Sequence, residues 1–225
     1  MDEIESRWRA FAIASLGIHQ DAIDVGWELL SRMYAGRHYH NLRHVHEMVT
    51  RLDDDPVARD SKESRRILES AVWFHDAIYD VRAGQGKNEL LSAELATIYL
   101  HGAGLGTDPE FIDEVVRCIL ATRHDAPARD ELEALMIDLD LMSLASEPAA
   151  YIEHARNIRR EYEFADDVSW WKGRGNFLRG MLARSSIYQT ARFRLLEGRA
   201  RANLTAEAQY VGRRLASTAQ APGSL

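Results

Sequence analysis

Residues 71–80 read AVWFHDAIYD and place a histidine and an aspartate, His75 and Asp76, inside a strongly apolar run. An imidazole or a carboxylate is expensive to bury unless it is paired or binds a metal. Trp73, Phe74 and Ile78 surround the pair in the sequence, so both groups need a compensating partner. We therefore expect a divalent metal, which satisfies an imidazole and a carboxylate at the same time.

A second segment is rich in metal-binding side chains. Residues 38–46 read HYHNLRHVH and hold four of the nine histidines of the chain. His40 and His44 are four residues apart, so on a helix they share one face. The later run MIDLDLMSL, residues 136–144, adds Asp138 and Asp140 between large apolar side chains. Together these groups form a mixed set of nitrogen and oxygen ligands that suits a divalent metal and hydrolytic or oxygen chemistry.

Composition excludes several other classes. The chain has 225 residues, a net charge of −7 and one cysteine, Cys118. The negative charge argues against electrostatic binding of nucleic acid, and a single cysteine excludes an internal disulfide. The acidic N-terminus is unlike a secretory signal, and no apolar stretch approaches the length of a membrane span. We expect a soluble cytoplasmic protein that acts on a small molecule; the sequence leaves its oligomeric state open.

Apolar residues recur at helical spacing along the chain, and no strand alternation is present. All five prolines lie where this pattern breaks. The pattern predicts helices over residues 3–16, 21–34, 41–52, 61–79, 88–100, 108–123, 131–145, 149–164, 167–184 and 188–217. The sequence thus predicts one all-α domain over residues 1–217, a bundle of about nine or ten helices. Its metal-site core spans about residues 30–146, the C-terminal helices about 149–217, and residues 218–225 form a disordered tail.

The order of these groups, a histidine, a His-Asp pair and a later aspartate, resembles the HD-domain superfamily of metal-dependent phosphohydrolases. The segment YHNLRHVHEM, residues 39–48, is similar to the Y-H-N-x-x-H signature of cyclic nucleotide phosphodiesterases in that superfamily. The set YHNLRH, AVWFHDAIYD, NELLSAELA, ILATRHD and DLDLMSL resembles a bacterial group of predicted HD-superfamily hydrolases. This resemblance spans about residues 30–205.

The resemblance implies a divalent metal, one or two ions of Mn, Fe, Co, Ni, Mg or Zn. It implies as ligands His44, His75, Asp76 and one carboxylate of the DLD sequence, for which we choose Asp140 and keep Asp138 as the alternative.

The resemblance also implies two catalytic residues, His40 as general acid and Glu89 as a group that orients water. The alternative for Asn88-Glu89 is structural: Asn88 caps a helix and Glu89 is favoured in its first turn. The second His-Asp pair, His124-Asp125, stands before Ala-Pro, where we expect an exposed turn. His124 remains a candidate for a second metal or for substrate.

The function that this resemblance implies is hydrolysis of a nucleotide or another small phosphate ester by water that the metal activates. Arg43 and Arg123 are candidates for holding phosphate oxygens, because a guanidinium pairs well with them. One alternative is a di-iron oxygenase of HD type, which usually needs additional histidines between the His-Asp pair and the final aspartate. The other alternative is a metal-binding module without catalytic activity.

Overall fold

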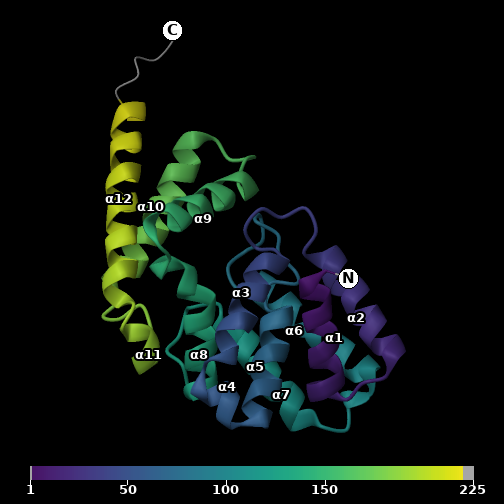
Figure 1. The fold of residues 1–225 in the computed structure, drawn as a ribbon. Coiled ribbons are helices and arrows are strands. Elements are labelled where there is room, and N and C mark those ends of the chain that lie inside the picture. The colour runs from purple at the N-terminus through teal and green to yellow at the C-terminus, as the bar shows by residue number, and fades with distance from the viewer. Residues whose placement is uncertain (1, 220–225) are drawn as a thin grey trace. The chain divides into compact units, whose positions relative to one another are not determined.

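The computed structural model describes residues 2–219, and in this part of the chain all secondary structure is helical, without a β-strand (Figure 1). The prediction of an all-α protein is confirmed. The chain divides between Asp140 and Leu141 into two compact units, called unit 1 and unit 2 here. Whether residues 1–217 behave as one domain stays a prediction. Within residues 2–219, no helix combines the length and the apolar character that crossing a membrane requires.

Unit 1 is built around helix α5. Residues 67–74, the last eight of this helix, are all buried, so the helix is covered on every side. It packs against α3, α4, α6, α7 and α8 and lies in the middle of the unit (Figure 1). The α-helices of unit 1 are α1 Glu3–Phe11, α2 Gln20–Met33, α3 Leu42–Asp53, α4 Pro56–Asp60, α5 Lys62–Phe74, α6 Lys87–Leu100, α7 Pro109–Ala121 and α8 Glu131–Asp140.

An aromatic cluster joins the N-terminal helices to α5 and α6. The Trp8 ring lies 5.4 Å from Trp73 and 5.9 Å from Tyr99, in edge-on and tilted contacts. Gly26 on α2 leaves room for Trp8 and Tyr99, because a Cβ there would lie 2.4 Å from a ring carbon of Trp8 and 2.4 Å from the Tyr99 hydroxyl oxygen. The tryptophans of unit 1 that are fully buried, Trp8 and Trp73, therefore serve packing.

The prediction for unit 1 is wrong at the end of α5 and omits α4. The helix predicted over residues 61–79 ends at Phe74, and His75 is its C-cap. The Ala77 amide bonds to the Phe74 carbonyl at 2.9 Å, so the chain turns directly after His75. Helix α4 was not predicted, although Asp55 caps its first turn and Pro56 opens it.

Unit 2 consists of α9 Pro148–Glu161, α10 Asp167–Ala183, α11 Ala191–Arg194 and α12 Glu197–Ala219, preceded by a 3-10 turn Leu141–Ala145. Helices α10 and α12 pack along each other (Figure 1). Arg174 on α10 joins them through two bonds to Glu207 on α12, of 2.8 and 2.9 Å.

The single helix predicted over residues 188–217 is interrupted. Glu197 accepts bonds from the backbone amides of Ile187 and Tyr188, which holds the preceding segment outside a helix. Helix α12 continues to Ala219, two residues beyond the predicted end. The rest of the predicted tail, residues 220–225, lies outside the described residues.

Candidate metal centre

Four side chains that can bind a metal converge in unit 1. His44 lies in the first turn of α3, His75 and Asp76 directly follow α5, and Asp140 is the last residue of α8. One ligand atom from each of them lies within 4.8 Å of the corresponding atoms of the other three. The structure therefore brings together the four residues that the sequence analysis selected.

Asn41 fixes the start of α3 and with it the position of His44. The Asn41 side chain caps the helix and accepts a bond from the Arg43 amide at 2.9 Å. It also donates to the carbonyls of Arg37 and His38 at 3.2 and 3.0 Å. His44 then falls on the buried face of the helix and is 4 % exposed.

The orientation of His75 is set by its own helix. Its Nδ1 lies 2.9 Å from the Val72 carbonyl oxygen. A carbonyl oxygen accepts and never donates, so Nδ1 carries the proton and Nε2 of the neutral ring presents a lone pair. This Nε2 is buried, lies 3.2 Å from Asp76 Oδ2 and 3.6 Å from Asp140 Oδ1, and has no hydrogen-bond partner among residues 2–219.

Both carboxylates of the cluster are ionised. Burial would raise the pKa of Asp76, but the charge of His75 outweighs it and lowers that pKa to about 2. Burial would also raise the pKa of Asp140, but the neighbouring imidazoles of His124, His44 and His75 hold it well below the usual range. For His75 burial acts in the other direction, and the two carboxylates overcome it and raise the pKa well above that of free imidazole.

The donor set fits a divalent metal. Asp76 is buried and Asp140 is half-buried, and a proton on His75 compensates only one of their two negative charges. A divalent cation compensates both and also takes the unpaired Nε2 lone pair, for which the protein must keep the imidazole neutral. Mixed imidazole and carboxylate ligands suit the metals Mn, Fe, Co, Ni and Zn, and carboxylates also suit Mg.

His40 lies beside the four-residue cluster and is not part of it. Its ring stacks on Tyr79 with 3.9 Å between ring centroids and meets Tyr39 edge-on at 4.8 Å. The charge of protonated His40 lowers the pKa of Asp76, so the two side chains are electrostatically coupled. This imidazole is therefore held in a fixed orientation near the carboxylates.

Arg37 connects the segment of His40 to the turn of Asp76, and the sequence analysis did not select it. Its guanidinium donates to the carbonyl oxygens of Asp76, of Ala77 at 2.8 Å and of His40 at 3.3 Å. It also lies over the Tyr79 ring, 5.7 Å from the centroid. Its position directly before HYHN could have indicated a role at the site. Two of its three carbonyl partners, Asp76 and Ala77, are however about 40 residues away in the sequence.

Glu89 and Arg123 lie at the edge of the cluster. Burial raises the pKa of Glu89, and the negative charges of Asp76 and Asp140 add to this effect. The Arg123 side chain packs over Gly86, where a Cβ would lie 3.2 Å from its Nε. Gly86 also has a φ of +72°, a backbone conformation that favours glycine.

The proposed capping role of Asn88 is wrong. Helix α6 begins one residue earlier, at Lys87, and Gly86 is its N-cap. Asn88 instead exchanges two bonds with the backbone of Asp80, of 3.0 and 3.1 Å, and so closes the loop between them. Glu89 does lie in the first turn, where the helix dipole favours a negative charge.

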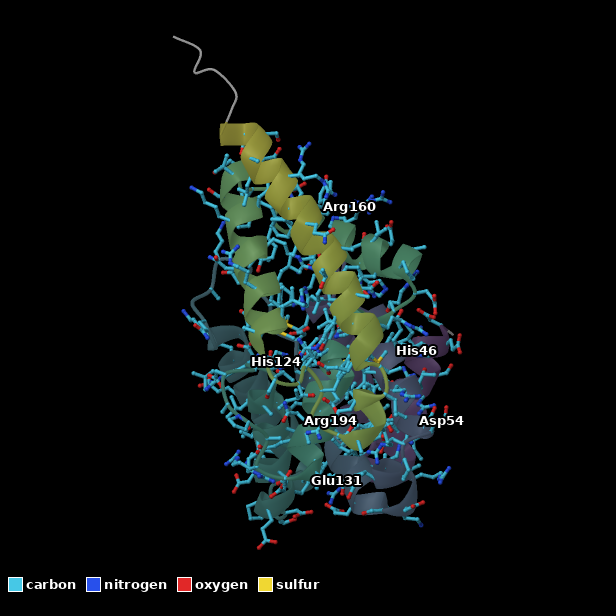
Figure 2. The ribbon with its side chains drawn as sticks, turned by 90° about the vertical axis from the view of Figure 1, so that its left-hand side faces the viewer. His46, Asp54, His124, Glu131, Arg160 and Arg194 are labelled. Carbon is cyan, nitrogen blue, oxygen red and sulfur yellow. The ribbon has the colours of Figure 1, made fainter. Side chains whose placement is uncertain are left out.

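His124 contacts the cluster, contrary to the expectation of an exposed turn. Its Nε2 lies 2.8 Å from Asp140 Oδ2, while Oδ1 of the same carboxylate faces His44 Nε2 at 3.3 Å. His124 is labelled in Figure 2 and has a φ of 56°, a left-handed conformation in which a side chain is strained. Its neighbour Asp125 is exposed, as predicted.

Two other predicted residues lie apart from the cluster. Asp138 is fully buried but is not one of the four grouped side chains. Residues two apart on a helix point about 200° apart, so Asp138 and Asp140 cannot face the same site from one helix. Arg43 is exposed in the first turn of α3.

Comparison with known proteins adds one finding about the fold. The structure is similar to the crystal structure of the phosphodiesterase domain of the RhoPDE fusion protein from the choanoflagellate Salpingoeca rosetta, with a TM-score of 0.61 and 13 % sequence identity over 97 % of this chain and 92 % of that one. No protein-family model matches the sequence, and no curated protein matches it. The chain thus has an all-α fold like that of a phosphodiesterase domain, with a buried His/Asp cluster that can hold a metal. Membership of the HD superfamily stays a prediction.

Proposed function

We propose that the protein is a metal-dependent phosphoric ester hydrolase, a phosphatase or phosphodiesterase that acts on a nucleotide or another small phosphate ester. The observation that carries this proposal is the convergence of His44, His75, Asp76 and Asp140 within 4.8 Å. The similarity of the fold to a phosphodiesterase domain supports the same reaction class.

The four clustered side chains would hold the metal. When bound, a divalent metal supplies a nucleophile from water at neutral pH and withdraws charge from a phosphoryl oxygen. His75 can serve as a ligand through Nε2 because Val72 binds its Nδ1. Asp140 can serve through Oδ1 because His124 binds its Oδ2.

His40 is the proposed general acid. The leaving oxygen of a phosphate ester needs a proton, and an imidazole titrates close enough to neutral pH to give one. Stacking on Tyr79 orients the ring, and the bond from Arg37 to the His40 carbonyl fixes its backbone. His40 therefore has the support that a proton donor needs without being a ligand.

Two further residues have proposed roles with substrate and water. Arg123 offers a guanidinium to the non-bridging phosphate oxygens, since its Nε is buried and binds no described residue. Glu89 has a raised pKa and a buried oxygen that bonds to none of residues 2–219, so it can accept or hold a proton of water. Arg43, which is exposed, is a candidate only for the outer part of a substrate.

The direct test is metal analysis combined with hydrolysis of a phosphate-ester panel. We expect the purified full chain to bind one or two divalent ions and, with Mn, Co, Ni, Mg, Zn or Fe, to cleave a nucleotide or small phosphate ester. His75→Ala should abolish both metal content and turnover, and the matched control His46→Ala should keep both. His40→Ala should keep the metal and lose turnover, most strongly with poor leaving groups.

A di-iron oxygenase is the second candidate, and the contact between His124 and Asp140 favours it. That contact brings His124 to the cluster, and a second metal would need such an additional histidine ligand. Tightly bound di-iron with a mixed-valent signal, together with no cleavage of any phosphate ester, would decide for the oxygenase. A metal-loaded protein without either activity would instead be a binding module.

A further inference from the structure

A cavity lies wholly within unit 2, between α9, α10 and α12, and shares no residue with the metal centre. Its volume is about 620 Å³, within the range of about 300–1,000 Å³ that is usual for small-molecule sites. The lining residues that matter for its chemistry are Ile152, Ala155, Arg156, Arg160, Trp171, Asn203 and Tyr210.

One part of the lining is apolar and partly open to solvent. Trp171 and Tyr210 meet edge-on with 5.6 Å between ring centroids, and Trp170 lies 6.2 Å from Trp171. Ile152 and Tyr210 remain 49 % and 46 % exposed, although both are large hydrophobic residues. An apolar ligand body in the cavity would remove this surface from water, which is favourable.

Two arginines of α9 supply positive charge to the same cavity. Arg156 and Arg160, the latter labelled in Figure 2, are four residues apart and so lie on one face of the helix. Arg156 lies 3.7 Å from Glu153, and among the described residues Arg160 bonds only to the neutral side chain of Asn157, at 3.0 Å. Arg159 is different, because its guanidinium donates to backbone carbonyls of the following loop. In a chain with a net charge of −7, this is a local positive site.

The acidic residue of the lining does not cancel that charge. Glu207 receives two bonds from Arg174 and a third from the Tyr151 hydroxyl. Its negative charge is therefore compensated within the unit, and an anion in the cavity is not repelled by a bare carboxylate. The charge of Arg156 is partly compensated by Glu153, and the charge of Arg160 remains to attract one.

Asn203 adds a buried polar group. It is 7 % exposed and donates both amide hydrogens, to the carbonyls of Leu144 and Ser146 at 3.0 and 2.9 Å. Its amide oxygen accepts no bond from the described residues, so it is left to accept one from a hydroxyl or N–H group of a ligand.

We propose that this cavity is a second binding site, for an amphipathic anion: a small molecule with an apolar body and one carboxylate, sulfonate or phosphate group. The body packs against Ile152, Trp171 and Tyr210, and the anionic group pairs with Arg156 and Arg160 at the rim. The proposal does not depend on hydrolysis at the metal centre.

The test uses anilinonaphthalene sulfonate, a fluorescent aromatic anion, with the full-length protein. We expect one saturable site per chain by fluorescence titration and calorimetry. The double variant Arg156→Ala/Arg160→Ala should weaken binding at least about tenfold, through loss of the charge contacts. Ala155→Trp should block binding, because the added indole fills the cavity without changing charge.

Two controls separate this site from general adsorption of the dye. Lys172→Ala/Arg213→Ala removes two exposed positive charges of unit 2 outside the lining and should leave the affinity unchanged. The neutral analogue N-phenylnaphthylamine should bind more weakly than the sulfonate. Absence of saturable binding, equal affinity for the neutral probe, or unchanged affinity in the lining variants that remain folded by circular dichroism would overturn the proposal.

Discussion

The chain contains the dipeptide His-Asp twice, and the two copies differ in burial and in their contacts with the metal centre. At the first copy, His75 and Asp76 are both buried, at 1 % and 8 % exposure, and both join the four-residue cluster. At the second copy, His124 reaches the cluster through Asp140 whereas Asp125 is exposed to solvent. The dipeptide is identical, so its surroundings decide: the first copy ends the central helix of unit 1, and the second lies in a turn.

The largest expected difference between the copies concerns their aspartates. Asp76→Asn should lose bound metal and turnover entirely, because a neutral amide neither balances the metal charge nor binds it as strongly as a carboxylate. Asp125→Asn should leave both unchanged. The effects are measured as metal content by mass spectrometry and as the rate of hydrolysis of the phosphate ester that the unmodified protein cleaves. Full metal content in Asp76→Asn would show that Asp76 is no ligand.

The histidine of the second copy should have an intermediate effect. His124→Ala removes the group that holds Asp140 Oδ2, and such partners of metal ligands typically contribute about 10–100-fold to metal affinity or activity. His124→Asn should recover part of the loss, since asparagine tolerates the left-handed backbone and can donate a hydrogen bond.

His124→Gly separates strain from contact at this position. Glycine accepts the φ of 56° without strain, so thermal stability should rise while metal affinity falls as in His124→Ala. If all three substitutions leave metal affinity and turnover at the level of the unmodified protein, the contact with Asp140 has no functional role.

Arg37, which binds the backbone at the first His-Asp copy, should contribute less to turnover than the residues above. Arg37→Lys should lower turnover about tenfold, since losing one charged hydrogen bond of about 1.5 kcal/mol corresponds to that factor. Lysine cannot hold the carbonyls of His40, Asp76 and Ala77 in a planar fork. Metal content should stay unchanged, which separates positioning of His40 from loss of a ligand. Arg32→Lys, on the exposed surface of α2, is the control.

The smallest expected effect comes from a charged cluster of unit 1 that needs no metal. Burial would raise the pKa of Asp53, but hydrogen bonds from Arg7 and Arg65 lower it. A carboxyl with a lowered folded pKa stabilises the protein above its unfolded pKa of about 3.9, and this stability is lost as the pH falls through the folded value.

Asp53→Asn should therefore flatten the loss of stability between about pH 5 and 3, by about 1 kcal/mol or less because Asp53 is 39 % exposed. Thermal melts of both proteins across this pH range measure it. Treatment with a chelator should leave this difference unchanged, in contrast to the effects at Asp76. A variant that loses stability in parallel with the unmodified protein would contradict the prediction.

The sequence was sufficient where a local pattern carries the information. Helical spacing of apolar residues predicted the helices of unit 1, except for α4 and for the ends of α1, α5 and α8, which lie five residues before the predicted ends. The resemblance implied Asp140 as a ligand with Asp138 as the alternative, and Asp140 is the one of the two that lies in the cluster. For the helices, the deciding contacts lie within a few residues along the chain.

It was insufficient where the partner is distant. Arg37 was missed because it binds carbonyls about 40 residues away, and His124 was expected in solvent because its partner, Asp140, is 16 residues later. The interruption before α11 depends on Glu197 binding the Ile187 amide, a tertiary contact that competes with the helix. Helical periodicity reflects only neighbouring residues, so it cannot predict contacts between residues that are far apart in the sequence.

By itself, then, the amino-acid sequence determined that this protein is all-α and that an imidazole and a carboxylate at residues 75 and 76 are buried among apolar side chains. Those properties follow from helical periodicity and from the free-energy cost of burying a charge, and both depend on residues that are close together in the sequence. Only the tertiary structure decided that Asp140 rather than Asp138 meets them, that His124 contacts Asp140, and that a cavity forms between α9, α10 and α12. Such groupings depend on how helices pack, and packing brings together residues whose sequence separation carries no information about their distance.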